Sequence, residues 1–399
     1  MSEELRPNLK SMLSEAKDTS EIMVDLAYAA LFYLSPDIAE ELDRLEKRLT
    51  ELIFDMRILC LVAARSREDA EGMASVLQVV GAIEKIANAA VDIGRIVTRN
   101  LGIPAGLIRD LSQAEEVVTR ARVRRNSQGC GATLRDLQLP TEFGVRVIAI
   151  RRGDDWVFDP AGPDVVSEDD VVFMQGPPDG IAAVRELFGA PPLSPPPYDP
   201  EEEFTDLGRA IDVLVEMKNI SEAAVGLAYS ALMFNDRSLA AEVRRLEERM
   251  DEMREQLELW TLRAAAASID PRPLRGLLHL GVASESIGDA AVDMVWLVEE
   301  NEEIHPVFAL SMGESDETVI KTRVAEDSRA AGSTLGDLRV EVETGVRILA
   351  IRRKARWIYR PRGFTRLEPG DELIGVGPPE GEESLAFLVG STATAARFD

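Results

Sequence analysis

Histidine and cysteine are scarce in this 399-residue sequence, which holds only two of each. The cysteines, Cys60 and Cys130, lie in no CxxC pattern and give no disulfide framework. The histidines, His279 and His305, lie outside any metal-ligand spacing such as HExxH. A GxGxxG motif after a strand and a GxxxxGK motif followed by Ser or Thr are missing too. These absences predict a protein that is not an enzyme.

Basic residues and long apolar runs are also in short supply. The chain has 45 Lys and Arg against 71 Asp and Glu, which gives a net charge of −26. Such a chain repels a phosphate backbone, so we expect no nucleic-acid partner. No apolar run approaches the roughly 18 residues of a membrane span, and the N-terminus lacks the apolar core of a signal peptide. The expected location is the cytoplasm, with a peripheral position at the inner face of the membrane if the protein serves one.

What the sequence does contain is a second copy of itself, 201 residues further on. VRVIAIRR at 145–152 returns as VRILAIRR at 346–353, and Trp156 returns as Trp357. The offset does not change along the chain, so no net insertion separates the halves. A Pro-rich stretch at 191–202 reads as the linker between them. We therefore expect an internal pseudo-dimer, and a homo-oligomer beyond it.

Each half reads as a helical part followed by a smaller part with strands. Three long patterns of helical period come first, and short runs of alternating or continuous apolar residues follow. The predicted fold class is α+β multidomain, in which two three-helix bundles alternate with two small α+β modules. The predicted boundaries are 1–112 for the first bundle, 113–190 for the first module, 191–202 for the linker, 203–313 for the second bundle and 314–391 for the second module.

The third helical pattern of the second half carries three carboxylates at every fourth position, Glu285, Asp289 and Asp293. This spacing places them on one helix face, where like charges repel. The same face of that helix holds no basic residue. The carboxylates therefore either repel one another in solvent or hold a divalent cation, because hard oxygen ligands suit magnesium, calcium, manganese or iron.

The corresponding face of the first half carries Glu84 and Asp92. Lys85, Arg95 and Arg99 share that face and can balance the two carboxylates. Exposed pairs of this kind contribute only tenths of a kcal/mol and require no function. A solvated face is the simpler interpretation here, and a metal site the alternative.

The sequence at 285–293 resembles the ExxxD signature of PhoU-type three-helix bundles. The resemblance implies a metal cluster on the outer face of the bundle, with Glu285 and Asp289 among its ligands. In the first half Glu84 matches the first motif position, but Asn88 replaces the Asp. The resemblance therefore implies a complete motif on this helix in the second half alone.

A further ExxxD lies on the first helical pattern, at Glu21 and Asp25. Its copy in the second half keeps Glu222 but has Gly226. Each half thus retains one complete ExxxD, on different helices. We include Glu21 and Asp25 among the candidate metal ligands.

The small modules resemble the TrkA C-terminal domain, also called the RCK C-domain. The resemblance rests on Gly-x-Thr-Leu-x-x-Leu, then an apolar strand that ends in two arginines, a Trp, and Gly-Asp before another apolar strand. The matching residues are Gly131, Thr133, Leu134, Leu137, Gly144, Arg151 and Arg152 in the first copy, and Gly332, Thr334, Leu335, Leu338, Gly345, Arg352, Arg353, Gly370 and Asp371 in the second. The first copy departs from the pattern at Asp169-Asp170. Each half is similar to one unit of the archaeal PhoU–TrkA-C proteins.

Arginines and tryptophans near the strand ends are the candidate ligand-binding residues of the modules. Arg can bind phosphate in a bidentate manner, and Trp can stack on a base or a guanidinium. The candidates are Arg151, Arg152, Trp156, Arg352, Arg353 and Trp357. Further arginines make the second copy the first place to expect a phosphate-bearing ligand: Arg356, Arg360, Arg362 and Arg366. The alternative is that the arginines are solvated and each Trp covers a sheet edge.

The resemblance implies a cytosolic regulatory protein of potassium or other cation transport. It implies a membrane cation transporter or channel as partner, and a cyclic dinucleotide or another small ligand on the TrkA-C-like modules. One alternative is a PhoU-type metal-binding adaptor in phosphate signalling, against which Asn88 and Gly226 weigh. A metal-dependent hydrolase is a further alternative, which the absence of pocket-forming residues beside the carboxylates disfavours.

Overall fold

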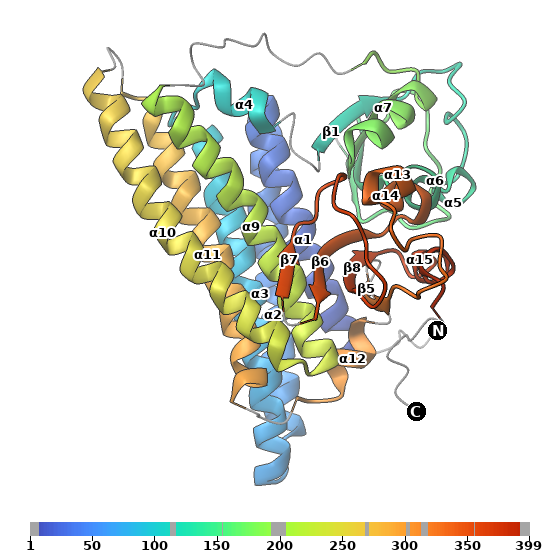
Figure 1. The fold of residues 1–399 in the computed structure, drawn as a ribbon. Helices are drawn as coiled ribbons and strands as arrows, with labels where there is room; N and C mark the ends of the chain where they lie inside the picture. The colour runs from blue at the N-terminus through green and yellow to red at the C-terminus, as the bar shows by residue number, and fades with distance from the viewer. Residues whose placement is uncertain are drawn as a thin grey trace, which may run out of the picture. The chain divides into compact units, whose positions relative to one another are not determined.

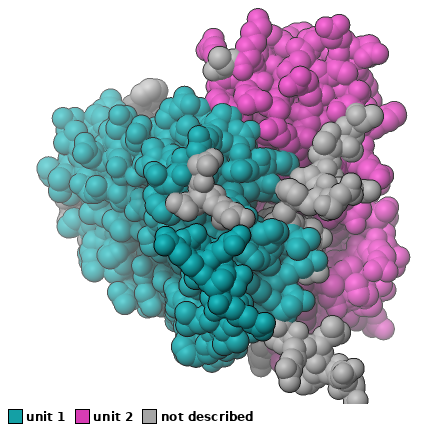
Figure 2. Space-filling view, turned by 90° about the horizontal axis from the view of Figure 1, so that it is seen from below, with its two compact units in different colours: residues 1–103, 205–315, 398–399 teal, residues 104–204, 316–397 magenta. Residues whose placement is uncertain are grey.

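The computed structural model divides the chain into two compact units, and each unit draws on both halves of the sequence (Figure 2). One unit comprises residues 1–103 and 205–315, and the other comprises residues 104–204 and 316–397. The residues that the structure describes are 8–111, 117–153, 155–192, 205–267, 271–300, 304–312, 318–354 and 356–391. The predicted linker at 191–202 therefore lies almost wholly outside the described residues.

Long helices build the first unit (Figure 1). Those of the first half are α1 (Leu9–Tyr33), α2 (Pro36–Ala63) and α3 (Arg67–Thr98). Those of the second half are α9 (Asp206–Phe234), α10 (Arg237–Ala267) and α11 (Leu274–Glu299), followed by the short α12 (Val307–Met312). The three helical patterns predicted for each half are confirmed.

Local sequence fixes several of these helix ends. Ser66 and Asp69 form a capping box at the start of α3. The Ser66 hydroxyl accepts a hydrogen bond from the backbone N–H of Asp69, and the Asp69 carboxylate accepts one from the backbone N–H of Ser66. Asn8 and Thr205 cap α1 and α9, the first helix of each half. Pro36 occupies the first turn of α2, where its missing N–H has no helical partner to lose.

The two bundles share one helical body, because α3 packs against α11. The apolar face predicted for α3 is buried, as Ile83, Ile86 and Ile93 show with exposures of 0–1%. α3 is also long and apolar enough to span a membrane by length and composition. Most of that apolar stretch, 61%, is buried among other parts of the protein, as expected for the central helix of a bundle.

The second unit contains two four-stranded antiparallel sheets of the same topology. The first sheet has the order β1-β4-β2-β3, and its strands are β1 (Val117–Arg122), β2 (Arg146–Arg152), β3 (Asp155–Phe158) and β4 (Val171–Gly176). The second has the order β5-β8-β6-β7, and its strands are β5 (Thr318–Arg323), β6 (Arg347–Arg353), β7 (Arg356–Tyr359) and β8 (Glu372–Gly377). The helical bundles and these sheet modules confirm the predicted α+β fold class.

Short helices accompany each sheet. The first module has α5 (Leu134–Leu137), α6 (Leu139–Phe143) and α7 (Pro178–Leu187), and α4 (Ala105–Leu111) precedes it. The second has α13 (Leu335–Leu338), α14 (Val340–Thr344) and α15 (Gly381–Val389). The helices α4, α6, α12 and α14 have only five to seven residues, too few for a helical period to stand out in the sequence.

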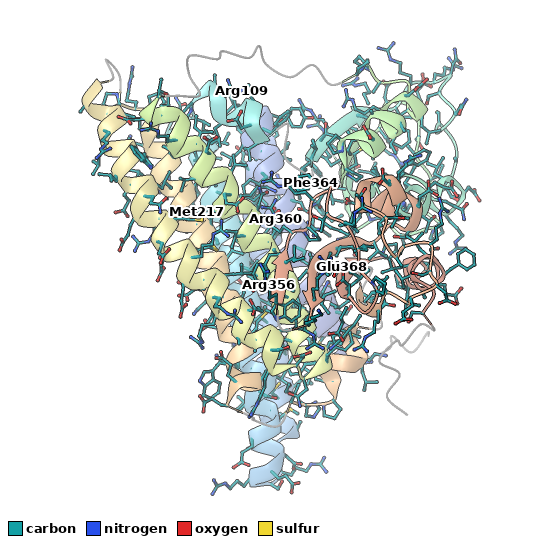
Figure 3. All side chains as sticks on the ribbon, viewed as in Figure 1. Arg109, Met217, Arg356, Arg360, Phe364 and Glu368 are labelled. Carbon is teal, nitrogen blue, oxygen red and sulfur yellow. The ribbon has the colours of Figure 1, made fainter. Side chains whose placement is uncertain are left out.

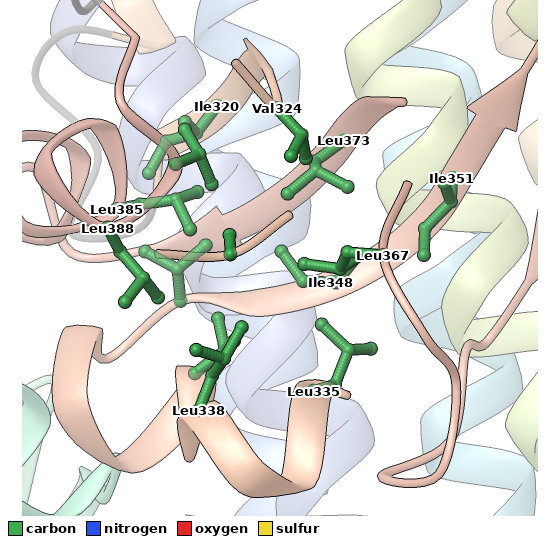
Figure 4. Packing of buried hydrophobic residues seen from close by; sticks show 14 residues of the cluster. Ile320, Val324, Leu335, Leu338, Ile348, Ile351, Leu367, Leu373, Leu385 and Leu388 are labelled. Carbon is green, nitrogen blue, oxygen red and sulfur yellow. The ribbon is translucent and has the colours of Figure 1, made fainter. Parts of the chain in front are cut away.

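Each module has its own hydrophobic core. In the second module, Ile348, Ile351 and Leu373 of the sheet meet Leu338 of α13 and Leu385 of α15 (Figure 4). The core of the first module is built from the equivalent elements and includes Val172 and Met174 of β4 and Phe188, which is fully buried. Two separate cores of this size are consistent with two modules that fold alike.

The two modules pair through α6 and α14. Gly144 ends α6 with a φ of +65°, and a Cβ atom there would lie 2.8 Å from the carbonyl oxygen of Glu341. Gly345 ends α14 with a φ of +71°, and a Cβ atom there would lie 2.6 Å from the carbonyl oxygen of Pro140. Because the repeat relates Gly144 to Gly345 and Pro140 to Glu341, the two contacts are equivalent. Glycine is required at both positions by conformation and by space, and the modules meet as a pseudo-twofold pair.

Candidate functional site

A cavity of about 430 Å³ opens where the two modules meet, and both modules line it. The first module contributes the α5–α6 turn, the start of β2, and the segment at 159–162 that follows β3. The second module contributes residues from α14, β6 and β8, and from the loop between β8 and α15. The charged and amide side chains among the lining residues are Arg135, Gln138, Arg146, Asp159, Gln175, Glu341, Arg347 and Glu380.

Arg146 and Arg347 open the central strands β2 and β6 and are equivalent in the repeat. The Arg146 guanidinium donates a hydrogen bond of 3.4 Å to Asp159, and only 15% of its side chain is exposed. Asp159 itself has a φ of +47°, an unusual value for a residue other than glycine. The local backbone therefore fixes one arginine–carboxylate pair at the wall of the cavity.

The lining of the cavity can bind a small polar molecule with both anionic and neutral parts. The volume of the cavity is within the roughly 300–1,000 Å³ of small-molecule sites. Three arginines, Arg135, Arg146 and Arg347, can bind phosphate or carboxylate oxygens. The carboxylates and amides can accept or donate hydrogen bonds to the remainder of a ligand.

The two modules contribute different charged side chains to the cavity, although their folds are alike. The repeat places Gly336 where the first module has Arg135, and Arg360 where it has Asp159. A cavity built around the second module would therefore have different chemistry. We did not predict this site from the sequence, because it forms only when α6 and α14 pack together. The reciprocal glycines Gly144 and Gly345 were the one signal that could have indicated the pairing.

Arg152 and Arg353, two of the predicted ligand-binding residues, instead anchor buried carboxylates. Arg152 donates to both carboxylate oxygens of Asp170 at 2.9 and 2.7 Å. Arg353 makes the same two bonds to Asp371. Asp170 and Asp371 are only 1% exposed, and these bonds raise the pKa of both guanidinium groups. The geometry gives the two arginines a structural role.

Arg151 and Arg352 each lie over the Trp that faces them across the hairpin. The guanidinium carbon is 5.7 Å from the centre of the Trp156 ring in one module and of the Trp357 ring in the other. Trp156 also stacks on Phe173 at 5.1 Å. None of these side chains lines the cavity, so ligand binding by them stays a prediction separate from that site.

The expectation that the second-half carboxylates lack counter-charges is wrong. Arg254 of α10 donates a hydrogen bond of 2.8 Å to Glu285. Lys85 of α3 pairs with Asp293. The counter-charges come from neighbouring helices, one of them in the other half of the chain, so the wheel of α11 alone could not reveal them.

Excess negative charge nevertheless remains on this face. Partial burial raises the pKa of Asp289 above its ordinary value, and the nearby Asp251 carboxylate raises it further. Partial burial likewise raises the pKa of Glu285 and of Glu247, the latter with help from Asp251 and Asp289. In the first half the residues equivalent to Asp251 and Asp289 are Thr50 and Asn88. We call the second-half group Glu247, Asp251, Glu285, Asp289 and Asp293 the acidic face.

In the first half, ion pairs occupy the carboxylates predicted as possible ligands. Glu84 pairs with Arg57 of α2 at 2.5 Å, and Asp92 pairs with Arg95 at 2.6 Å. The balance expected for Asp92 is confirmed. The charge of Glu84 is balanced by Arg57 of α2 rather than by a residue on the same face of α3, because α2 lies directly against α3.

Glu21 is half-buried and lies beside a buried lysine. Lys17 donates to Glu21 at 2.7 Å, and 4% of the lysine side chain is exposed. The repeat reproduces this pair in Lys218 and Glu222, also at 2.7 Å. The ammonium groups lie over tyrosine rings of the opposite half, Lys17 over Tyr229 and Lys218 over Tyr28.

Asp25, the other member of the predicted pair, is 7% exposed. Asp25 is thus buried, whereas 23% of the Glu21 side chain is exposed. Across the described ranges of the chain, no three Asp, Glu, His or Cys side chains gather closely enough to hold a metal ion. Metal binding at any of the candidate residues remains a prediction.

Comparison with known families matches two domain types, each occurring twice. The PhoU domain matches residues 13–97 and 214–298. The TrkA-C domain matches residues 118–189 and 319–389. Together the matches cover more than three quarters of the chain and agree with the helical and sheet parts described above.

Curated relatives match over shorter stretches. The Ktr system potassium uptake protein C of Bacillus subtilis is 26% identical over 101 residues, which is 25% of this chain and 44% of that protein. An uncharacterized transporter of Synechocystis is 34% identical over 81 residues, 20% of this chain and 13% of the transporter. The chain thus spans less than half the length of these relatives.

Solved structures give weak overall superpositions. PhoU from Pseudomonas aeruginosa aligns with a TM-score of 0.40 at 13% identity, covering 73% of this chain and 93% of that chain. The GsuK RCK domain aligns with a TM-score of 0.19 at 15% identity, covering 78% of this chain and 79% of that chain. The assignment of the domains therefore rests on the two domain families.

Proposed function

We propose that this chain, which belongs to the proteins built from PhoU and TrkA-C domains, is a non-enzymatic regulator of potassium transport. A small ligand would bind between its two TrkA-C modules. The observation that carries the proposal is the cavity of about 430 Å³ that both modules line. A ligand that contacts both modules binds their paired arrangement more tightly than a separated one, and such a difference is what regulation requires.

The curated relatives indicate which transport process the chain would regulate. One is a potassium uptake protein, and the other is described as a transporter. We infer that the partner of this chain is a membrane potassium transporter or channel, which it serves from the cytoplasm. A pull-down of the full chain from detergent-solubilised membranes of its own organism tests this part. Recovery of a multi-spanning cation transporter supports it, and recovery of phosphate-transport components alone contradicts it.

The charges of the cavity indicate the ligand class. Three arginines on the wall suit a nucleotide or cyclic dinucleotide, whose phosphates would lie near Arg146 and Arg347. Binding to the native state raises stability by RT ln(1 + [L]/Kd), which is about 2.7 kcal/mol at one hundred times Kd. Thermal unfolding of the full chain is therefore measured with cyclic di-AMP, cyclic di-GMP, ATP, potassium chloride and magnesium chloride.

A matched pair of variants locates the response. Arg347→Ala removes a cavity arginine, and Arg323→Ala removes an exposed arginine of the same module outside the cavity. We expect at least one nucleotide probe to raise the unfolding temperature of the wild type and of Arg323→Ala by several degrees, and to have little effect on Arg347→Ala. Equal shifts in both variants would place the ligand elsewhere, and no shift with any probe would contradict a nucleotide ligand.

A phosphate-signalling adaptor is the second candidate, and the PhoU domains favour it. In this case the acidic face would hold iron, manganese or another metal. Elemental analysis of the purified full chain decides between the two. Stoichiometric metal that is lost in Asp289→Ala supports the adaptor, and metal-free protein with full nucleotide response supports the potassium regulator.

A further inference from the structure

The segment that follows β2 in the first module and the equivalent segment that follows β6 in the second module carry opposite charges. Residues 153–166 of the first module contain four acidic and no basic side chains. The equivalent residues 354–367 of the second module contain five basic and no acidic side chains. The chain as a whole has a net charge of −26, so this positively charged segment is opposite in sign to the rest of the protein. We call it the basic loop.

The basic loop is exposed and carries an aromatic side chain near its tip. Arg356, Arg362 and Arg366 are exposed, and Phe364 between the last two is 76% exposed. Figure 3 labels Arg356 in β7, Arg360 just after this strand, and Phe364 in the loop beyond. A large apolar side chain flanked by cations is typical of groups that enter the headgroup region of a lipid bilayer.

The hairpin accepts either sign of charge at the position of Arg356. In the first module Arg152 faces Asp155 across the hairpin. In the second module Arg353 faces Arg356, and the Arg353 guanidinium is paired with Asp371 and Glu368. Because the same fold holds an acid at this position in the first module, the fold itself does not require a basic side chain at Arg356.

We infer that the basic loop docks the protein onto the surface of an anionic lipid bilayer. None of the residues 354–366 lines the cavity between the modules or the second cavity, beside Arg122 and Arg185. An exposed loop that lines neither of these cavities suits an extended charged surface better than an enclosed small molecule. Each Lys or Arg close to such a surface is worth about 1 kcal/mol, and a cluster of four or more makes binding measurable.

Vesicle flotation of the full chain tests the inference. Vesicles of phosphatidylglycerol mixed with phosphatidylcholine are compared with vesicles of phosphatidylcholine alone, at about 0.1 M and at about 1 M salt. We expect binding to the anionic vesicles at low salt, and its loss at high salt because the screening length falls to about 3 Å. The vesicles contain no transporter, so failure here leaves the proposed function untouched.

The repeat supplies the variants. Arg356→Asp with Arg362→Ala installs the residues of the first module, and we expect vesicle affinity to fall at least tenfold, since two basic side chains are lost. Phe364→Ala is expected to lower affinity several-fold at constant charge. Arg67→Asp with Arg125→Ala changes the net charge equally at exposed positions elsewhere, and should retain affinity within about twofold.

Three results would overturn the inference. The first is equal binding to neutral and anionic vesicles, or none to either. The second is an equal loss of affinity in the control variant, because the effect would then reflect net charge alone. The third is displacement from vesicles by millimolar inorganic phosphate where chloride of the same ionic strength has no effect, which would make the loop a phosphate site. Circular dichroism confirms that each variant is folded.

Discussion

The two halves of the chain share ion pairs with buried members at equivalent positions, and they differ in two clusters of charge. Both bury the lysine of a Lys–Glu pair, Lys17–Glu21 and Lys218–Glu222. Both also bury the carboxylate of an Arg–Asp pair in the sheet module. By contrast, the acidic face and the basic loop each occur in one half only. Packing constrains these pairs alike in both copies, whereas other charges differ between the halves, buried Asp25 against Gly226 among them.

The largest effect expected from this comparison concerns the buried Arg–Asp pairs. Arg152→Ala leaves Asp170 buried without its guanidinium partner, and Arg353→Ala does the same to Asp371. Removal of one member of a buried pair costs about 3–5 kcal/mol. We expect both substitutions to lower the free energy of unfolding by about 3 kcal/mol in urea titrations of the full chain. A loss below about 1 kcal/mol in either module would show that the equivalence of the two interiors is incomplete.

The pairing of the modules gives the next largest effect. Gly345→Ala introduces a Cβ atom 2.6 Å from the carbonyl oxygen of Pro140, at a positive φ. Gly332→Ala has a positive φ as well, +83°, but no atom within 4 Å of the new Cβ. Backbone strain of about 1 kcal/mol is common to both, so the excess loss in Gly345→Ala reports the contact between modules.

We expect Gly345→Ala to lower the unfolding free energy by at least about 1 kcal/mol more than Gly332→Ala, since overpacking typically costs 1–3 kcal/mol. Thermal and urea unfolding measure the difference. The ligand response of the cavity should weaken in Gly345→Ala only. Equal behaviour of the two variants would argue against pairing through α6 and α14.

The acidic face gives a smaller and opposite effect. Asp289→Asn installs the residue that the first half has at Asn88. Because folding raises the pKa of Asp289, the ionised carboxyl destabilises the folded state at neutral pH. Its removal should therefore raise the unfolding free energy at pH 7 by some tenths of a kcal/mol, up to about 1 kcal/mol.

The pH dependence has a definite sign. A carboxyl whose pKa is raised by folding loses its stabilising contribution as pH rises through the interval between its unfolded and folded pKa values. The wild type should therefore lose stability relative to Asp289→Asn across that interval, and the two should converge below the ordinary carboxyl pKa. Greater stability of the wild type at pH 7, abolished by a chelator, would instead indicate a bound metal ion.

The first half supplies the control with the smallest effect. Asn88→Asp restores the carboxylate on a face where Arg57 and Arg95 already pair with neighbouring acids. We expect a change in unfolding free energy within about 0.5 kcal/mol in either direction, as for other exposed charges. A large loss would mean that the two faces differ by more than their net charge.

Periodicity and the repeat were sufficient to predict the long helices, the strands and the two kinds of module. These features depend on local sequence and on burial of one face, which recur at the same offset in both halves. The partner of Glu285 and that of Asp293 could not be predicted in this way. Arg254 and Lys85 come from other helices, and only the packing of α3 and α10 against α11 brings them close.

The candidate site shows the same limit. Paired arginines at the strand ends suggested a ligand site, but Arg152 and Arg353 hold buried carboxylates. The cavity is lined by Arg146 and Arg347, at the other end of the same strands. Nothing in the pattern of one module distinguishes these two ends, because the cavity exists only where the two modules meet.

Potassium uptake in cells tests the central claim most directly. Rubidium-86 influx is measured in the organism of origin with the gene deleted, and after complementation with the wild type, with Arg347→Ala or with Arg323→Ala. We predict that deletion changes the influx several-fold, that the wild type and Arg323→Ala restore it, and that Arg347→Ala does not although it accumulates to the same level. Influx that is the same in all four strains would contradict a role in potassium transport.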